Sequence, residues 1–398
     1  MNKRSSSLVI LAASRYQIPF IQRAKQMGYR VITVDNVPEN PGHVLADRAV
    51  HVSTIDEEGV LQVAREEKVA GILAPCTDVA VPTAAFVSER LGLPGVPVRV
   101  ASIVCRKTRF REFQQANGFR TPNWWMVTDE PLSLDSLGGC VVVKPDMASG
   151  AKGTRIVTER DDLDAAITEA AQVSLNGVVL MEKFLQGCQV TCEGFWAEGS
   201  IVFSMITDRL TAAPPFVTTQ GHVTPSTLGV KMEEAILGEI SAVLRALGMQ
   251  QTLFDADVVV YGDEVYLLEI ALRVGGNSIA DLVRVSGGID LCEAAITLAC
   301  EGVWRPKTAS IWWRPSCLRI LGSSQAGILD YDLAKVVEVR SWTGVEKVEL
   351  DVLPKTYVEA FTNSRHRVGE VITTGATREE AGARMERVIK QLSLRLES

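Results

Sequence analysis

Residues 1–98 alternate strand-like and helix-like segments, and this alternation restricts the fold more than any other feature of the chain. Short apolar runs are separated by stretches of helical spacing, which is typical of parallel strands joined by helices. Such a sheet binds ligands at its switch point, predicted here near residues 12–16 and 76–78. The strands are predicted at residues 9–13, 31–35, 49–53 and 71–75, and the helices at 18–28, 57–68 and up to Leu91.

A glycine-rich loop follows the β-branched run at residues 141–143. Lys144 ends the run, and Gly150, Lys152 and Gly153 follow it. Small residues let backbone N–H groups close on phosphate oxygens, and lysines supply positive charge. The P-loop pattern is absent, because the loop follows the lysine instead of preceding it. The segment predicts a phosphate cradle, with a glycine-rich hairpin carrying solvated lysines as the alternative.

Two acidic residues flank a predicted β-hairpin turn at residues 262–263. Asp257 lies on the first strand and Glu269 on the returning strand, at similar distances from the turn. Antiparallel pairing would bring both carboxylates onto one face, where they repel unless a cation lies between them. Oxygen ligands suit Mg²⁺. The alternative is a hairpin with acids on its wet face, but the surrounding runs are apolar, where an unpaired carboxylate is costly.

Between these motifs, an apolar strand ends in Glu182, Lys183, Phe184 and Leu185, and an alternating strand starts after Gly187. A hinge of this kind offers backbone groups to the edge of a purine, with Leu185 against its face. The helix-like segment at residues 105–122 precedes all of these motifs and ends at Gly118 and Pro122, as a helix stop should.

In this order and spacing, the motifs resemble the ATP-grasp carboxylate–amine ligases over nearly the whole chain. The resemblance implies an α/β protein with an ATP-grasp fold, an N-terminal Rossmann-like (pre-ATP-grasp) domain and a C-terminal α+β extension. The N-terminal section also resembles ATP-grasp proteins of polysaccharide and secondary-metabolite loci, including carbamoyl-phosphate-synthase-like ones, and the L-amino acid ligases. The implied units are residues 1–98, residues 99–185 with the glycine-rich lid, residues 186–306 with the metal site, and residues 307–398.

The resemblance also implies site residues. Lys107, Lys144 and the loop residues would hold ATP phosphates, Glu182 and the Lys183 and Leu185 backbones would surround adenine, and Gln189 stands where an acid commonly holds the ribose. Arg273 would face the transferred phosphate or the substrate carboxylate. The nucleotide set is Lys107, Lys144, Ser149, Gly150, Lys152, Gly153, Glu182, Lys183, Leu185 and Gln189, the metal set is Asp257 and Glu269, and the catalytic set is Arg273, His222 and Lys144.

Three departures from the family pattern stand out. Ala271 replaces the asparagine that often completes the second Mg²⁺ shell, so the pattern is compatible with either one or two bound metal ions. Gln189 replaces the ribose acid, although an amide still donates to and accepts from hydroxyls. The first strand and its turn, at residues 8–20, lack the dinucleotide glycine pattern, which disfavours a nicotinamide or flavin role.

The implied activity uses ATP and Mg²⁺, with Mn²⁺ as a possible substitute, to phosphorylate a carboxylate that an amine then attacks. The product would be an amide or peptide bond, and the acid a small amino or sugar acid. One alternative activates bicarbonate, as carbamoyl-phosphate and biotin-carboxylase relatives do. A second alternative is a nucleotide-binding module without turnover, for which Ala271 and Gln189 argue.

The substrate end of the site is less legible. Residues 207–228 resemble a loop that closes over the acceptor, with His222 either stabilising charge and accepting a proton or capping a turn. Arg209 has the chemistry to pair with a substrate carboxylate, whereas Arg284 lies in a helical context that favours an ordinary surface arginine. Asp78 and Arg15 are substrate-contact candidates, with a helix cap and a surface arginine as the favoured alternatives. Gly275, Gly276 and Asn277 form a plausible anion nest.

Composition agrees with a globular enzyme of 398 residues, 46% of them hydrophobic. A net charge of −7 without a basic block argues against nucleic acid as a partner. The sequence contains no uninterrupted apolar stretch of about 18 residues, so no membrane span is predicted. The basic N-terminal tip precedes a run too short and strand-like for a secretory signal. Eight cysteines without a C-x-x-C pair indicate reduced thiols of a cytoplasmic protein, and the family resemblance implies a homodimer.

Overall fold

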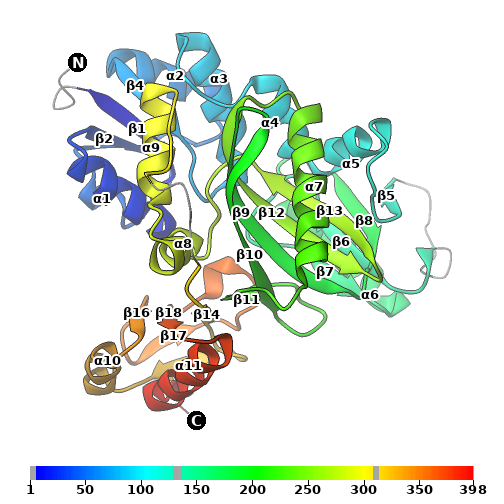
Figure 1. Cartoon of the computed structure of the whole chain (residues 1–398), viewed down its shortest axis with the longest axis vertical. Helices are drawn as coiled ribbons and strands as arrows, with labels where there is room; N and C mark the ends of the chain where they lie inside the picture. Colours follow the sequence, from blue (N-terminus) through cyan, green and yellow to red (C-terminus); the bar gives the residue numbers. More distant parts are fainter. Residues whose placement is uncertain (1–5, 129–133, 135–136, 308–312, 398) are drawn as a thin grey trace.

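The computed structural model describes residues 6–128, 134, 137–307 and 313–397, so the basic N-terminal tip and residues 308–312 of the Pro- and Trp-rich join lie outside it. The N-terminal part contains a four-stranded parallel sheet in the order β3-β2-β1-β4, as the alternation predicts. Figure 1 shows this sheet in blue with its helices around it. Its elements are β1 Ser7–Leu11, α1 Ile18–Gln26, β2 Arg30–Val34, β3 Arg48–Val50, α2 Glu57–Glu66, β4 Val69–Leu73 and α3 Val81–Leu91, with 3₁₀ turns at Arg15–Gln17, His43–Leu45 and Asp78–Ala80.

Local signals explain where these helices begin and end. The Asp56 side chain accepts a hydrogen bond from the Gly59 N–H (3.0 Å) and caps α2, whose first turn also carries two glutamates. α3 has a proline in its first turn and ends at Gly92, whose φ of +64° is the left-handed conformation of a helix C-cap.

A four-stranded antiparallel sheet, in the order β5-β8-β6-β7, carries the glycine-rich loop. The loop joins β6 to β7, so it is a hairpin connection, as the alternative of a glycine-rich hairpin predicted. That alternative also predicted solvated lysines, but Lys144 at the base of the loop is buried. The elements are α4 Val98–Val104, α5 Lys107–Ala116, β5 Trp124–Met126, β6 Val141–Pro145, β7 Arg155–Val157, α6 Arg160–Val173 and β8 Val179–Lys183.

The third sheet has eight antiparallel strands in the order β13-β12-β9-β10-β11-β14-β18-β16. The prediction of a loop at residues 207–228 is wrong, because most of these residues form the β10–β11 hairpin. In the sequence, the Ala-Pro-Pro turn at residues 213–215 obscures the strand on either side of it. The elements are β9 Cys188–Ala197, β10 Ser200–Thr211, β11 Thr219–Thr224, α7 Val230–Ala246, β12 Gln251–Tyr261, β13 Glu264–Ala271, β14 Ser316–Leu321, β16 Val345–Leu350 and β18 Gly369–Thr374.

The C-terminal strands β14, β16 and β18 extend this third sheet, so hydrogen bonding runs across the boundary predicted at residue 306. A small sheet, β17-β15-β19, and two helices complete this part, which lies at the bottom of Figure 1. The division into four units stays a prediction. The remaining elements are α8 Ile279–Gly287, α9 Leu291–Glu301, β15 Gly327–Asp330, α10 Leu333–Arg340, β17 Thr356–Val358, a 3₁₀ turn at Ser364–His366, α11 Arg378–Leu392 and β19 Arg395–Leu396.

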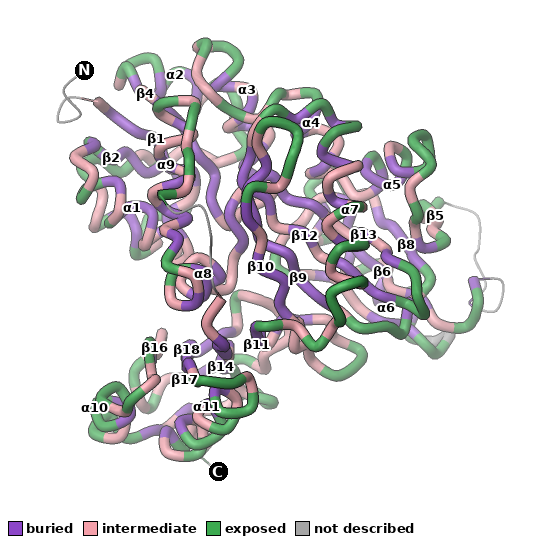
Figure 2. The backbone as a smooth tube through the Cα atoms, in the orientation of Figure 1, coloured by how far each residue is buried: buried purple, intermediate pink, exposed green. Residues whose placement is uncertain are grey.

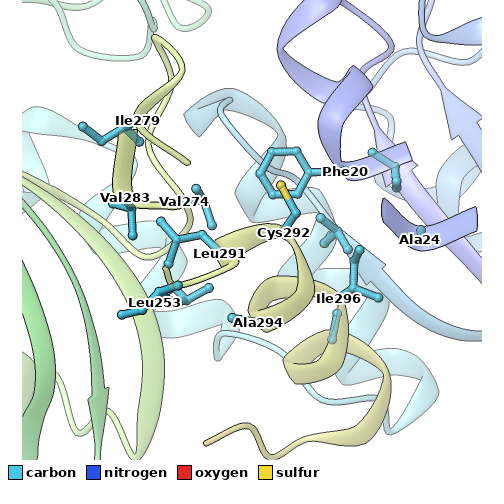
Figure 3. Close-up of a cluster of buried hydrophobic side chains, with 14 of the residues drawn as sticks. Phe20, Ala24, Leu253, Val274, Ile279, Val283, Leu291, Cys292, Ala294 and Ile296 are labelled. Atoms are coloured by element: carbon cyan, nitrogen blue, oxygen red, sulfur yellow. The ribbon is translucent and has the colours of Figure 1, made fainter. Parts of the chain in front are cut away.

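One apolar cluster joins the N-terminal part to the rest of the chain. Helix α9 packs against β4 and α1, although more than 200 residues separate it from either in sequence. Figure 3 shows Phe20 and Ala24 of α1 meeting Cys292 and Ile296 of α9, all buried. Burying a side chain such as Phe20 or Ile296 stabilises the fold by roughly 1.5–3 kcal/mol. This interface therefore fixes the position of the N-terminal part relative to the rest of the chain, and both parts line the cleft described below.

Burial follows the sheets, whose strands run as purple segments through the interior in Figure 2. The eight cysteines form no disulfide bonds; Cys192, Cys292 and Cys317 are buried and Cys188 is exposed. None of the described helices is both long enough and apolar enough to cross a membrane.

Candidate active site

A cleft of about 820 Å³ lies where the three sheets meet. Every residue of the predicted nucleotide, metal and catalytic sets lines it except Gly153, including Lys107, Lys144, both predicted metal carboxylates, His222 and Arg273. The predicted switch-point residues Ala12, Arg15, Tyr16 and Asp78 line it as well. Residues predicted from motifs more than 100 positions apart are thus brought to one surface.

At the nucleotide end, Lys144 and Glu182 face each other on the neighbouring strands β6 and β8 and form an ion pair. Arg111 donates from Nε to the Glu182 carboxylate over 2.8 Å, and its own side chain is only 1% exposed. Burial raises the pKa of Glu182, but Arg111 and Lys144 outweigh it and lower this pKa to about 2. The Glu182 carboxylate is therefore ionised and anchors Lys144.

Arg111 was missed by sequence reasoning. It lies four residues after Lys107, the first residue of α5, and so shares a helix face with it. That spacing was the available signal. Lys107 reaches the glycine-rich loop, with its Nζ 3.4 Å from the Ala148 carbonyl oxygen. At the hinge, the Lys183 N–H already donates to the Asn123 carbonyl (2.8 Å), so this N–H is engaged within the protein.

The glycine-rich loop is docked against the C-terminal part. The Ser364 N–H donates to the Gly150 carbonyl over 3.1 Å. Gly150 has a φ of +71°, and a Cβ at this position would lie 2.1 Å from Ser364 Oγ. Lys152 also lines the cleft, and burial followed by the charge of Arg365 lowers its pKa. The loop position thus depends on glycine for both conformation and space.

Replacing Gly150 with alanine is expected to weaken nucleotide binding about tenfold, because the loop cannot keep its docked position. Gly177 is a matched control, since its φ of +70° is nearly the same but nothing lies within 4 Å of the position that an alanine methyl group would take there. Both variants carry about 1–2 kcal/mol of backbone strain. Calorimetric titration with ADP measures the difference, and equal dissociation constants for Gly150→Ala and Gly177→Ala would contradict the steric role.

The predicted metal carboxylates are direct cross-strand partners. Asp257 of β12 pairs with Glu269 of β13, as the hairpin pattern predicts. Thr191 Oγ1 donates to one Asp257 oxygen over 2.9 Å, and Arg209 Nη1 donates to the other over 2.5 Å. In the described part of the chain, no group of three or more His, Cys, Asp or Glu side chains forms a metal cluster. Two adjacent carboxylates that share a cleft with Lys107 and Lys144 fit Mg²⁺, which commonly binds through one or two carboxylates plus phosphates.

Arg273 is held by two carboxylates. Its Nε and Nη2 donate to Asp78 over 2.9 and 2.5 Å, and its Nη1 donates to Asp255 over 3.2 Å. The helix-cap interpretation of Asp78 is therefore wrong, because its carboxylate pairs with Arg273 and Thr77 occupies the N-cap position. Arg15, by contrast, is 38% exposed and pairs with Asp351.

Asp255 is a second residue that the sequence reasoning missed. Burial raises its pKa to about 7, against the attraction of Arg273. Its cross-strand partner Glu193 is buried, accepts a hydrogen bond from the Gly275 N–H (3.1 Å), and has a pKa raised well above its usual range by burial and by Asp255. The alternation Asp255-x-Asp257, which places both acids on one strand face, was the available signal.

His222 lies within strand β11 and not in a loop, so the turn-capping interpretation is wrong. It is buried, its Nδ1 lies 3.0 Å from Thr207 Oγ1, and Arg209 is its cross-strand partner. Burial, followed by the charge of Arg209, lowers its pKa to about 3. A histidine with so low a pKa is a weak base, so His222 suits hydrogen bonding better than proton acceptance.

This pKa predicts a pH dependence of stability. Below pH 6.5 the unfolded chain protonates His222 while the folded chain does not, so stability falls as the pH drops from 6.5 towards 3. The slope from this group is ~1.4 kcal/mol per pH unit. His222→Gln should flatten the loss in urea unfolding between pH 7 and pH 5, and His51→Gln, at an exposed position, should not. Parallel curves for the wild type and His222→Gln would contradict the buried neutral state.

The remaining substrate-end predictions divide clearly. Arg209 lines the cleft, whereas Arg284 lies outside it, 55% exposed and paired with Asp281, as a surface arginine should be. Gly276 and Asn277 line the cleft directly after Arg273, and Asn277 has a φ of +50°. This conformation is compatible with the predicted anion nest.

Two family models match the chain. A model of the ATP-grasp domain matches residues 138–281, and a model of the L-amino acid ligase C-terminal domain 2 matches residues 327–397. The formate-dependent phosphoribosylglycinamide formyltransferase of Synechococcus sp. (strain RCC307) is 30% identical over 188 residues, which are 46% of this chain and 48% of that relative. The chain therefore spans about half the length of that relative.

Two solved structures share the fold over almost the whole chain. The L-amino acid ligase from Bacillus licheniformis has a TM-score of 0.80 at 22% identity and covers 99% of both chains. The phosphoribosylglycinamide synthetase from Anaerococcus prevotii has a TM-score of 0.76 at 20% identity and covers 98% of this chain and 100% of its own. The chain therefore contains an ATP-grasp domain, matched over residues 138–281, and has the fold of these solved structures over almost its whole length. Residues 327–397 match the C-terminal domain of the L-amino acid ligases.

Proposed function

We propose that the protein is an ATP-dependent carboxylate–amine ligase that forms an amide or peptide bond on a small amino acid or sugar acid. The observation that carries this proposal is the convergence of Asp257 and Glu269 with Lys107, Lys144 and Arg273 in one cleft. Carboxylates for a divalent ion and cations for phosphate oxygens are the groups that phosphoryl transfer requires, because its catalysis rests on positioning and charge neutralisation. The match to the L-amino acid ligase C-terminal domain supports the amino-acid choice.

In this proposal, Lys107 and Lys144 bind the phosphates of ATP, the glycine-rich loop covers them, and Asp257 and Glu269 hold Mg²⁺. The bound Mg²⁺ would supply positive charge to the phosphate oxygens; Mn²⁺ would be a substitute. Arg273, whose guanidinium is oriented by Asp78 and Asp255, faces the carboxylate that receives the γ-phosphoryl group. The amine nitrogen then attacks the acyl carbon, the C–N bond forms, and phosphate leaves with the former carboxylate oxygen.

The cleft also has to exclude water, which would hydrolyse an acyl phosphate. The hydrogen bond between Gly150 and Ser364 holds the glycine-rich loop, which lines the cleft, against the C-terminal part, so the C-terminal part would contribute to closure. We further propose a homodimer, as the family resemblance implies, and a reducing, cytoplasmic compartment, which the absence of disulfides among the eight cysteines supports.

The test is phosphate release from Mg·ATP with pooled amino acids and uronic acids, each with and without amine pools. Release that needs both a carboxylate and an amine is the expected result. Release with bicarbonate alone would instead favour a bicarbonate-activating enzyme. No release in any pool, with ADP still bound in calorimetry, would favour a nucleotide-binding module.

A further inference from the structure

The carboxylate proposed to bind the metal already has a cationic partner from the protein. Arg209 Nη1 lies 2.5 Å from Asp257 Oδ2, and the two side chains are 16% and 28% exposed. Both groups line the cleft, and Arg209 lies on β10 while Asp257 lies on β12, with β9 between them. The arginine therefore reaches across one strand to the carboxylate.

Arg209 is positioned for this contact by a second hydrogen bond. Its Nε donates to Thr219 Oγ1 over 2.8 Å, which directs the rest of the guanidinium towards Asp257. The other Asp257 oxygen accepts the Thr191 hydroxyl over 2.9 Å. Both carboxylate oxygens are thus hydrogen-bonded by the protein, one to a neutral donor and one to a charged donor.

A divalent cation and a guanidinium on the same carboxylate repel each other, and this repulsion is strong in a partly buried site. The neutral Thr191 hydroxyl has no such conflict. We propose that Arg209 is an internal counterion of the metal site, which neutralises Asp257 before the metal ion arrives and is displaced from Asp257 when the ion binds. This inference rests on the metal site of the proposed function.

The arrangement has a functional consequence. Asp257 and Glu269 are cross-strand partners that line the cleft, and without a cation beside them they would repel each other. Arg209 offsets part of that charge and, by competing for Asp257, lowers the affinity for a divalent ion alone. An ion that arrives with nucleotide phosphates gains further ligands, so the competition favours loading of the metal together with the nucleotide.

The test is direct measurement of Mn²⁺ binding to nucleotide-free protein by electron paramagnetic resonance. Arg209→Gln is expected to bind Mn²⁺ about five- to tenfold more tightly than the wild type, because the competing charge is gone. An arginine that merely orients Asp257 for the metal would give the opposite sign, so weaker or unchanged binding would overturn the proposal. Arg284→Gln, outside the cleft, is the matched control and should leave the affinity unchanged.

Two further variants keep the test decisive. Thr219→Val removes the hydrogen bond that positions Arg209 and should tighten Mn²⁺ binding by a smaller factor, which provides the same test if Arg209→Gln fails to fold. Asp257→Asn should abolish the Mn²⁺ site. If Asp257→Asn leaves Mn²⁺ binding intact, the proposed metal site itself is wrong, whereas a lost site in Asp257→Asn with unchanged binding in Arg209→Gln refutes only the counterion role.

Discussion

Replacing Asp257 with asparagine is expected to lower carboxylate- and amine-dependent phosphate release on the order of 10³-fold. The side chain keeps its shape but loses the charge that would hold Mg²⁺ beside Glu269, its direct cross-strand partner. Phosphoryl transfer depends on charge neutralisation at this point, so the loss falls on turnover more than on nucleotide binding. The measurement is single-turnover phosphate release at saturating ATP.

A matched control lies on the same hairpin. Asp263 is exposed in the turn between β12 and β13, so Asp263→Asn changes the net charge equally without touching the cleft. It should retain turnover within a factor of about two. If Asp257→Asn and Asp263→Asn lose activity to the same small extent, the carboxylate pair has no role in the reaction.

Replacing Arg273 with methionine is expected to destabilise the protein by about 3–5 kcal/mol and to abolish turnover. The change removes the shared counterion of Asp78 and Asp255, both of which are left partly buried, and Asp255 also has Glu193 as its cross-strand partner. Urea unfolding measures the loss of stability. Arg284→Met, at an exposed helix position, is the control and should stay within about 0.5 kcal/mol of the wild type.

The loss of stability in Arg273→Met should depend on pH. Burial already raises the pKa of Asp255 to about 7, and removing Arg273 removes an attraction that lowers this pKa. When folding raises the pKa of a carboxyl, the folded state loses stability as the pH rises from the pKa of the unfolded chain to the pKa of the folded chain. The destabilisation should therefore be larger at pH 8 than at pH 5.5, and the reverse order would contradict the ion-pair explanation.

Several parts of the site were predictable because they follow from local patterns. The two-residue period of a strand, together with the turn at residues 262–263, predicted that Asp257 and Glu269 share a face, and they are direct partners. The alternation in residues 1–98 likewise predicted the parallel sheet. The substrate-end strands were missed, because the apparent loop at residues 207–228 contains a proline pair that obscures the β10–β11 hairpin.

The ion pairs across the cleft were not predictable in the same way. Sequence reasoning placed Lys144 and Glu182 at an ATP molecule, but did not show that they pair with each other or that Arg111 completes the pair. Nor did it show that Asp78 would hold Arg273 from 195 positions away. Such contacts depend on which sheets pack against each other, and the local spacing of apolar residues in the sequence carries no information about that packing.

The chain's own periodicities and turn residues were sufficient for the parallel sheet of residues 1–98, the β12–β13 hairpin and the order of the motifs, because these depend on neighbouring residues. Packing of the three sheets decided which charges meet. It buried His222 as a neutral group, set Arg209 on Asp257 and docked the glycine-rich loop on Ser364. Burial and charge pairing are properties of surfaces brought together from distant segments, so only the tertiary structure could define them.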